Sequence, residues 1–105
     1  MSWSERLPQI GIVLPPAAKP VANYVPAVRV GNLVYTSGQL PFVSGALEFR
    51  GKVHEGADGT VTPDQAISAA RQCTLNALSA IDALVGLDSI TRIVKVTGYV
   101  ASGPG

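Results

Sequence analysis

The sequence has one cysteine, Cys73, and one histidine, His54, in 105 residues. A single cysteine cannot form an internal disulfide, which fits a reducing compartment. A metal site needs three or four converging ligands, and neither an HExxH nor a CxxC motif is present. The glycine-rich motifs that hold nucleotide phosphates are absent as well. We therefore expect neither a metal ion nor a cofactor.

Charged side chains are also scarce. They make up 14% of the sequence, against about 25% in typical soluble domains. The eight basic residues are scattered and offset by seven acidic ones, so no basic patch favours a nucleic acid partner. No apolar run is long enough to span a membrane, and the N-terminus lacks the pattern of a secretion signal. These absences predict a soluble, cytoplasmic protein.

Apolar side chains, by contrast, are abundant, at 47% of the residues with a mean hydropathy of +0.29. A chain of this length builds one core, and the apolar excess favours burial between copies in a homo-oligomer. We expect a proline-rich arm over residues 1–23 and a single domain over residues 24–105. Each proline fixes its φ and removes a donor. The arm is therefore predicted to be extended rather than helical, with residues 10–14 as a candidate short strand.

The domain begins with the signature of a β-hairpin. Two β-prone runs, residues 27–30 and 33–37, flank Gly31 and Asn32, which both tolerate the positive φ of a primed two-residue turn. The second strand is expected to stop near Gln39, because Pro41 cannot donate to a ladder. Residues 47–50 alternate between apolar and charged side chains, which predicts a third short strand before a glycine-containing loop.

A long helix is predicted over Pro63 to Val85. Thr62 is the N-cap residue, with proline at the first helical position and Gln65 three residues after the cap, and Gly86 supplies the stop. At 100° per residue one arc of this helix is mostly apolar and is expected to be buried. The arc contains Ala66, Ile67, Ala70, Thr74, Ala77, Leu78, Ile81, Leu84 and Val85. Cys73 lies at its edge, where packing is the better interpretation of the thiol.

Residues 90–101 predict a long strand after the helix. The order of elements indicates an α+β fold, in which an antiparallel-hairpin sheet packs a long helix on one face. The segment that stands out chemically is Tyr35-Thr36-Ser37-Gly38, where a strand ends in a hydroxyl and free backbone N–H groups. Such a strand end can bind a ligand, or it can be an ordinary terminus with serine and glycine as strand breakers.

Residues 24–41, which include the run Thr36-Ser37-Gly38-Gln39-Leu40-Pro41, resemble the Rid (YjgF-like) family of reactive-intermediate deaminases, also described as L-PSP endoribonucleases or translation inhibitors. Residues 72–78 are similar to the family's helix, and residues 93–100 to its following strand. The resemblance implies a chorismate-mutase-like fold and a homotrimer with ligand clefts between subunits. It also implies hydrolysis of enamines and imines, such as 2-aminoacrylate, to 2-keto acids and ammonia. By motif match, Tyr24 and Ser37 correspond to cleft residues that bind a small 2-keto or 2-imino acid, and Gly38 adjoins them.

The sequence also departs from the family pattern. The arginine that binds the substrate carboxylate and the late glutamate belong, in the family, to a second helix and strands that would follow residue 105. Arg71 and Arg92 do not match those positions, so the catalytic residues stay unassigned. Three hypotheses remain: a deaminase, a noncatalytic small-molecule-binding trimer of the same family, and an endoribonuclease. The third has the least support, because the chain is nearly neutral.

Overall fold

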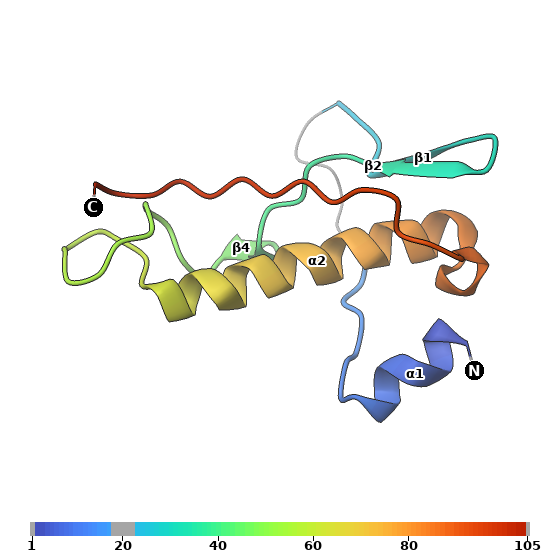
Figure 1. Ribbon diagram of the computed structural model, residues 1–105, viewed down its shortest axis with the longest axis horizontal. Coiled ribbons are helices and arrows are strands. Elements are labelled where there is room, and N and C mark those ends of the chain that lie inside the picture. The colour runs from blue at the N-terminus through green and yellow to red at the C-terminus, as the bar shows by residue number, and fades with distance from the viewer. Residues whose placement is uncertain (1, 18–22, 105) are drawn as a thin grey trace.

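Two antiparallel strand pairs and one long helix form the framework of the computed structural model, which describes residues 2–17 and 23–104 (Figure 1). The elements are α1 (Trp3–Gln9), β1 (Ala27–Val30), β2 (Leu33–Thr36), β3 (Phe42–Val43), β4 (Ala46–Leu47), α2 (Pro63–Val85) and the 3-10 turn η1 (Leu87–Ser89). Helix α2 packs against both strand pairs. The α+β fold class predicted from the sequence is confirmed.

The first strand pair is the predicted hairpin. Strands β1 and β2 pair antiparallel from Ala27 opposite Thr36 to Val30 opposite Leu33. Gly31 takes a positive φ of 57°, whereas Asn32 does not, contrary to the expectation for both. A positive φ at the first central position alone is the pattern of a type II′ turn, which also matches the twist of paired strands.

The second strand pair is very short. Strand β3 pairs with β4 through Phe42 opposite Leu47 and Val43 opposite Ala46. Ser44 and Gly45 make the connection with positive φ angles of 51° and 81°. The predicted third strand over residues 47–50 is therefore displaced, and only Leu47 belongs to a strand. Because two-residue strands contribute little on their own, this hairpin depends on its packing against α2.

Helix α2 begins and ends where the sequence predicts. The Thr62 hydroxyl accepts from the Gln65 backbone N–H at 3.2 Å, and the Gln65 side chain accepts from the Thr62 N–H at 3.0 Å. This reciprocal capping box satisfies two donors of the first turn. Gly86 ends the helix with a φ of 79°, a conformation that glycine adopts without the steric cost of a Cβ.

The buried face of α2 differs from the predicted one. Within the predicted apolar arc Ile67 is 68% exposed and Leu84 is 44% exposed. The buried helix residues are Leu75, Asn76, Ser79 and Ala80. Two of these are polar, and both donate to backbone carbonyls outside the helix. Hydropathy periodicity counts such side chains as solvent-facing, so it placed the buried face on the wrong side.

The N-terminal arm contains a helix, so the prediction of an extended, non-helical arm is wrong over Trp3–Gln9. A capping box formed by Ser2 and Glu5 starts α1. Pro8 lies in its last turn, where the helix ends one residue later. The predicted strand over residues 10–14 is not formed, and residues 18–22 of the arm lie outside the described residues.

Tertiary contacts fix α1 against η1. The indole Nε1 of Trp3 donates to the Ile90 carbonyl at 2.6 Å. The Ser4 backbone N–H donates to one carboxylate oxygen of Asp88 at 2.8 Å, and its hydroxyl donates to the other. These bonds join residues more than 80 positions apart. They stabilise α1, whose short, proline-containing sequence does not form a stable helix on its own.

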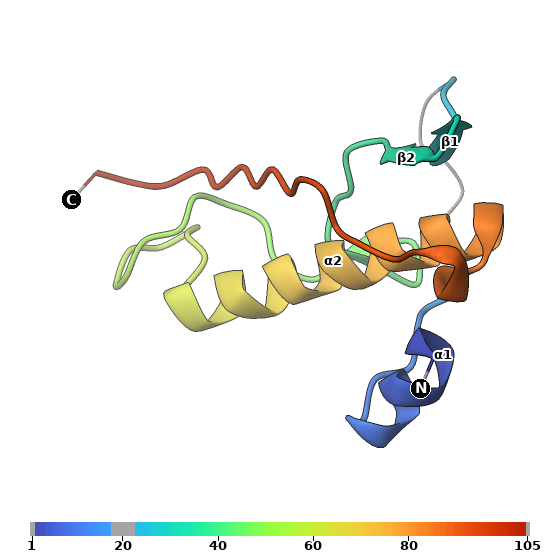
Figure 2. The same cartoon turned by 45° about the vertical axis from the view of Figure 1, so that its right-hand side comes forward.

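Residues 91–101 form no ladder with any described strand, which contradicts the predicted long strand. Figures 1 and 2 show this segment as an extended chain that runs alongside α2. Only beyond it does Ser102 form a bridge with Val53. Its apolar side chains lie open, with Val96 83% and Tyr99 93% exposed. Local preference makes the segment extended, but a strand also needs a partner backbone.

The described core is small and lies between α2 and the segments packed on it. The buried apolar residues are Ala27, Val61, Leu75, Ala80 and Leu87. The radius of gyration is 15.2 Å, against about 13 Å for a compact domain of about 100 residues. The chain is thus more open than a closed domain of its length.

Candidate functional site

The predicted site residues Ser37 and Gly38 lie where β2 ends. Ser37 is half-buried, and both its donors bond to the residue just before β1. Its backbone N–H donates to the Pro26 carbonyl at 2.8 Å, and its hydroxyl donates to the same oxygen at 3.2 Å. The hydroxyl orientation is therefore fixed, and its oxygen, which accepts from the Gln39 side-chain amide at 3.5 Å, can accept one further hydrogen bond.

Gly38 follows at an exposed position with open space around it. A Cβ built on Gly38 would meet no atom of the described chain within 4 Å, and its φ is not positive. Neither backbone conformation nor packing within this chain therefore requires glycine here. Its amide takes part in none of the backbone hydrogen bonds of the described loops, and so it can donate to a ligand.

Tyr24 lies near the same end of the hairpin. It precedes Pro26, whose carbonyl receives both Ser37 donors, by two residues. Its side chain is 41% exposed, and no hydrogen bond within the described chain holds its hydroxyl. Ser37 and Gly38 thus lie at the open end of the hairpin, and Tyr24 lies two residues before the Pro26 partner of Ser37.

A buried asparagine on α2 holds the segment that follows Gly38. Asn76 is 6% exposed, and its amide nitrogen donates to the carbonyls of Leu40 at 3.0 Å and Phe42 at 3.1 Å. Its oxygen accepts from Gln72 at 3.0 Å. Asn76 lies outside the apolar arc that the sequence predicts to be buried, and so this role was missed. The available signal was a pair of amides four residues apart on an otherwise uncharged part of the helix.

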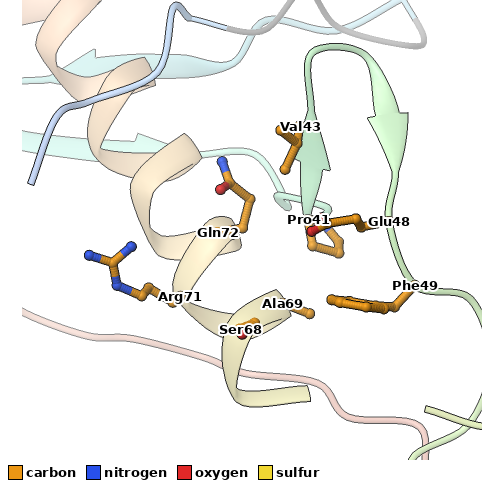
Figure 3. A pocket seen from close by; sticks show the side chains of 8 residues that line it. All are labelled: Pro41, Val43, Glu48, Phe49, Ser68, Ala69, Arg71 and Gln72. Carbon is orange, nitrogen blue, oxygen red and sulfur yellow. The ribbon is translucent and has the colours of Figure 1, made fainter. Parts of the chain in front are cut away.

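A cavity of about 180 Å³ lies between the β3–β4 hairpin and the N-terminal half of α2 (Figure 3). Its lining includes Pro41, Glu48, Phe49 and Gln72. The three predicted site residues do not line it. The end of the β1–β2 hairpin and this cavity are therefore separate features, joined through the segment from Gln39 to Phe42.

The resolved ionisation shifts lie outside both features. Partial burial raises the pKa of the Cys73 thiol, which agrees with a packing role for this residue. Hydrogen bonds from Ser4 lower the pKa of Asp88. In residues 2–17 and 23–104, no three His, Cys, Asp or Glu side chains gather as potential metal ligands. No helix in this part of the chain has the length and apolar character needed to cross a membrane.

Comparison with known proteins gives consistent matches over nearly the whole chain. The family model described as "YjgF/chorismate mutase-like, putative endoribonuclease" matches residues 4–102. Protein TCP17 from Trypanosoma cruzi is 44% identical over 101 residues, which cover 93% of this chain. The chain spans 59% of the length of that relative.

Two solved structures share the fold. A crystal structure described as a putative endoribonuclease from Shewanella oneidensis MR-1 is 35% identical with a TM-score of 0.72, and the match covers 85% of this chain and 56% of that one. The protein Atu1372 from Agrobacterium tumefaciens, of unknown function, is 38% identical with a TM-score of 0.61. That match covers 80% of this chain and 48% of the Agrobacterium chain.

Proposed function

The chain belongs to the YjgF/chorismate mutase-like, putative endoribonuclease family, and from this premise we propose that it is a reactive-intermediate deaminase. Its substrates would be small enamines and imines of 2-keto acids, such as 2-aminoacrylate. The observation that carries the proposal is the end of the β1–β2 hairpin, where Tyr24, Ser37 and Gly38 match the family's motif, and where the Gly38 N–H and one acceptor position of the Ser37 oxygen are open to a ligand.

The reaction is a hydrolysis. The enamine takes a proton on its terminal carbon and becomes the imine, and water then adds to the C=N carbon to give a carbinolamine. Proton transfer to nitrogen breaks the C–N bond and releases ammonia and the 2-keto acid. One water is consumed for each ammonia, and no oxidant or reductant is needed.

The three matched residues would bind and orient the substrate in this reaction. The Gly38 N–H would donate to a substrate oxygen. The Ser37 oxygen would accept from the imine N–H while its O–H continues to donate to the Pro26 carbonyl. The open space beside Gly38 would let a ligand approach the backbone closely. The Tyr24 ring would cover the ligand. The group that activates water is not assigned to any residue of this chain.

We propose further that the site is completed by a second copy in a homotrimer. Val30 is 62% exposed and Tyr35 is 57% exposed on the hairpin that carries Ser37. Such apolar surface is typical of interfaces between subunits. Light scattering at micromolar concentration should give three times the chain mass, and a stable monomer would contradict this part of the proposal.

The test of activity is ammonia release from freshly generated 2-aminoacrylate. Titration of 2-oxobutyrate into the wild type and Ser37→Ala measures binding separately from chemistry. Losing a hydrogen bond to a charged ligand costs about 1.5 to 3 kcal/mol, or roughly 10- to 150-fold in affinity. Ser102→Ala is a matched control, because Ser102 is exposed on the far C-terminal segment.

The outcomes separate the three hypotheses. Ammonia release by the wild type, impaired by Ser37→Ala and not by Ser102→Ala, supports the deaminase. Binding of 2-oxobutyrate without ammonia release supports the noncatalytic binding protein instead. Cleavage of a single-stranded RNA by the wild type, with no response to either keto acid or enamine, would favour the endoribonuclease.

A further inference from the structure

We propose that the cavity between the β3–β4 hairpin and α2 binds a small alkylammonium group. This site is separate from the proposed deaminase cleft, because Tyr24, Ser37 and Gly38 do not line it. The inference stands on the kinds of atoms that face the cavity, and on its volume.

Glu48 supplies a charged acceptor at the cavity, and Ser68 and Gln72 supply neutral polar groups that can donate or accept. Figure 3 shows the carboxylate of Glu48 reaching over Pro41 toward the helix. The Glu48 carboxylate takes part in no ion pair or hydrogen bond with the rest of the described chain. The Gln72 amide nitrogen gives one of its two N–H groups to Asn76 at 3.0 Å, and its oxygen can accept. Because the carboxylate is a charged acceptor without a partner in the described chain, it favours a ligand that donates from a positively charged group.

An aromatic face adds a second preference for positive charge. The ring of Phe49 is half-buried and extends toward Ala69, with Pro41 and Glu48 above it in Figure 3. A cation held between the ring face and the carboxylate would interact with both, because the face of an aromatic ring carries partial negative charge.

Arg71 lines the same cavity, but it does not make the cavity favourable for an anion. Its guanidinium group points to the opposite side of α2 from Glu48 and Phe49 (Figure 3). Its charge therefore neither neutralises Glu48 nor offers a bidentate site for a carboxylate or phosphate inside the cavity. An anionic ligand would meet the Glu48 carboxylate, and so the geometry disfavours it.

The volume restricts the size of the ligand. About 180 Å³ is the space of roughly six water molecules, and it is well below the range of about 300 to 1,000 Å³ of pockets for drug-sized ligands. A linear alkylammonium of four carbons fits this limit, and a long polyamine exceeds it. Such a group occurs in free small amines and at the end of a lysine side chain.

The test is a titration followed by NMR of the side-chain amide of Gln72. The probes are n-butylammonium, its neutral counterpart n-butanol, and lysine blocked at both backbone ends. We expect saturable shifts with n-butylammonium and none with n-butanol. Binding by blocked lysine at similar affinity would identify a polypeptide side chain as the source, whereas binding by n-butylammonium alone would identify a free amine. Equal binding of n-butanol would overturn the proposal.

Substitutions at Glu48 and Phe49 test separately the contribution of the carboxylate charge and that of the aromatic ring to binding. Glu48→Gln should weaken n-butylammonium about fivefold, the effect of an exposed ion pair, and Glu55→Gln on an exposed loop should change nothing. Phe49→Leu should weaken binding about two- to fivefold, while Phe49→Tyr keeps the ring and should keep the affinity even if the leucine variant fails to fold. Unchanged binding by Glu48→Gln would refute the inference.

Discussion

Asn76 is the residue whose replacement should reveal how the site segment is held. Asn76→Ala removes three hydrogen bonds, two to the carbonyls of Leu40 and Phe42 and one from Gln72. At about 1 kcal/mol each, their loss would cost about 3 kcal/mol. Leu40 is exposed and Phe42 is half-buried, so water can partly replace the lost donor. We therefore expect a loss of about 2 kcal/mol in the free energy of unfolding.

Asn76→Asp makes the test sharper, because it is nearly isosteric. At pH 7 the carboxylate would turn a charged oxygen toward two carbonyl oxygens at a site that is 6% exposed. It should therefore be more destabilising than alanine. Protonation gives the aspartic acid one O–H donor, so folding raises its pKa. The stability of this variant should consequently be highest at acid pH and should fall as the pH rises.

Urea denaturation followed by circular dichroism at 222 nm measures both variants. With a slope of about 1 kcal/mol per molar, Asn76→Ala should lower the midpoint by about 2 M. Asn23→Ala is the control, because Asn23 is exposed and its replacement should change stability by less than about 0.5 kcal/mol. An Asn76→Ala midpoint equal to that of the control, or an Asn76→Asp variant as stable as alanine at pH 7, would refute the reasoning.

Three further predictions concern the helices and the thiol. Thr62→Ala should lower stability by about 1 kcal/mol through loss of the capping box, whereas Thr62→Ser should not; thermal denaturation compares the two. Because hydrogen bonds from Ser4 lower the pKa of Asp88 below its ordinary value of 3.8, the bond between α1 and η1 contributes stability above that pH and loses it as the pH falls further. The fluorescence of Trp3 should report this acid transition, and Asp88→Asn should abolish it. Because burial raises the pKa of Cys73 above 9.0, iodoacetamide at pH 8 should alkylate it more slowly than free cysteine, while Cys73→Ala should leave ammonia release intact.

Features coded by adjacent residues were predictable from the sequence. The β1–β2 hairpin follows from two β-prone runs around Gly31 and Asn32, and the start of α2 follows from Thr62, Pro63 and Gln65. Each of these signals acts within a few residues, where backbone preference and capping decide the conformation. The fold class then follows from the order of the elements, and the motif around Ser37 identifies the family.

Features that depend on distant residues were not predictable in the same way. The four prolines within residues 1–23 argued against a helix, yet Ser2 and Glu5 carry a capping signal and bonds to Asp88 and Ile90 hold α1 in place. The extended segment 91–101 has the composition of a strand and lacks a partner strand among the described residues. The capping box of Ser2 and Glu5 could have been recognised in the sequence, whereas hydrogen bonds to residues more than 80 positions away could not.

The same distinction explains why the motif at Ser37 defines only part of its site. Ser37 and Gly38 mark the end of a strand, but their positions depend on the Pro26 carbonyl across the hairpin and on Asn76 from α2. In both cases the acceptor is a backbone carbonyl. Every residue type has one, and so the sequence does not identify the acceptors. It identifies only the donors. A polar residue inside an uncharged helix, such as Asn76, is therefore as informative about the shape of the site as the motif itself.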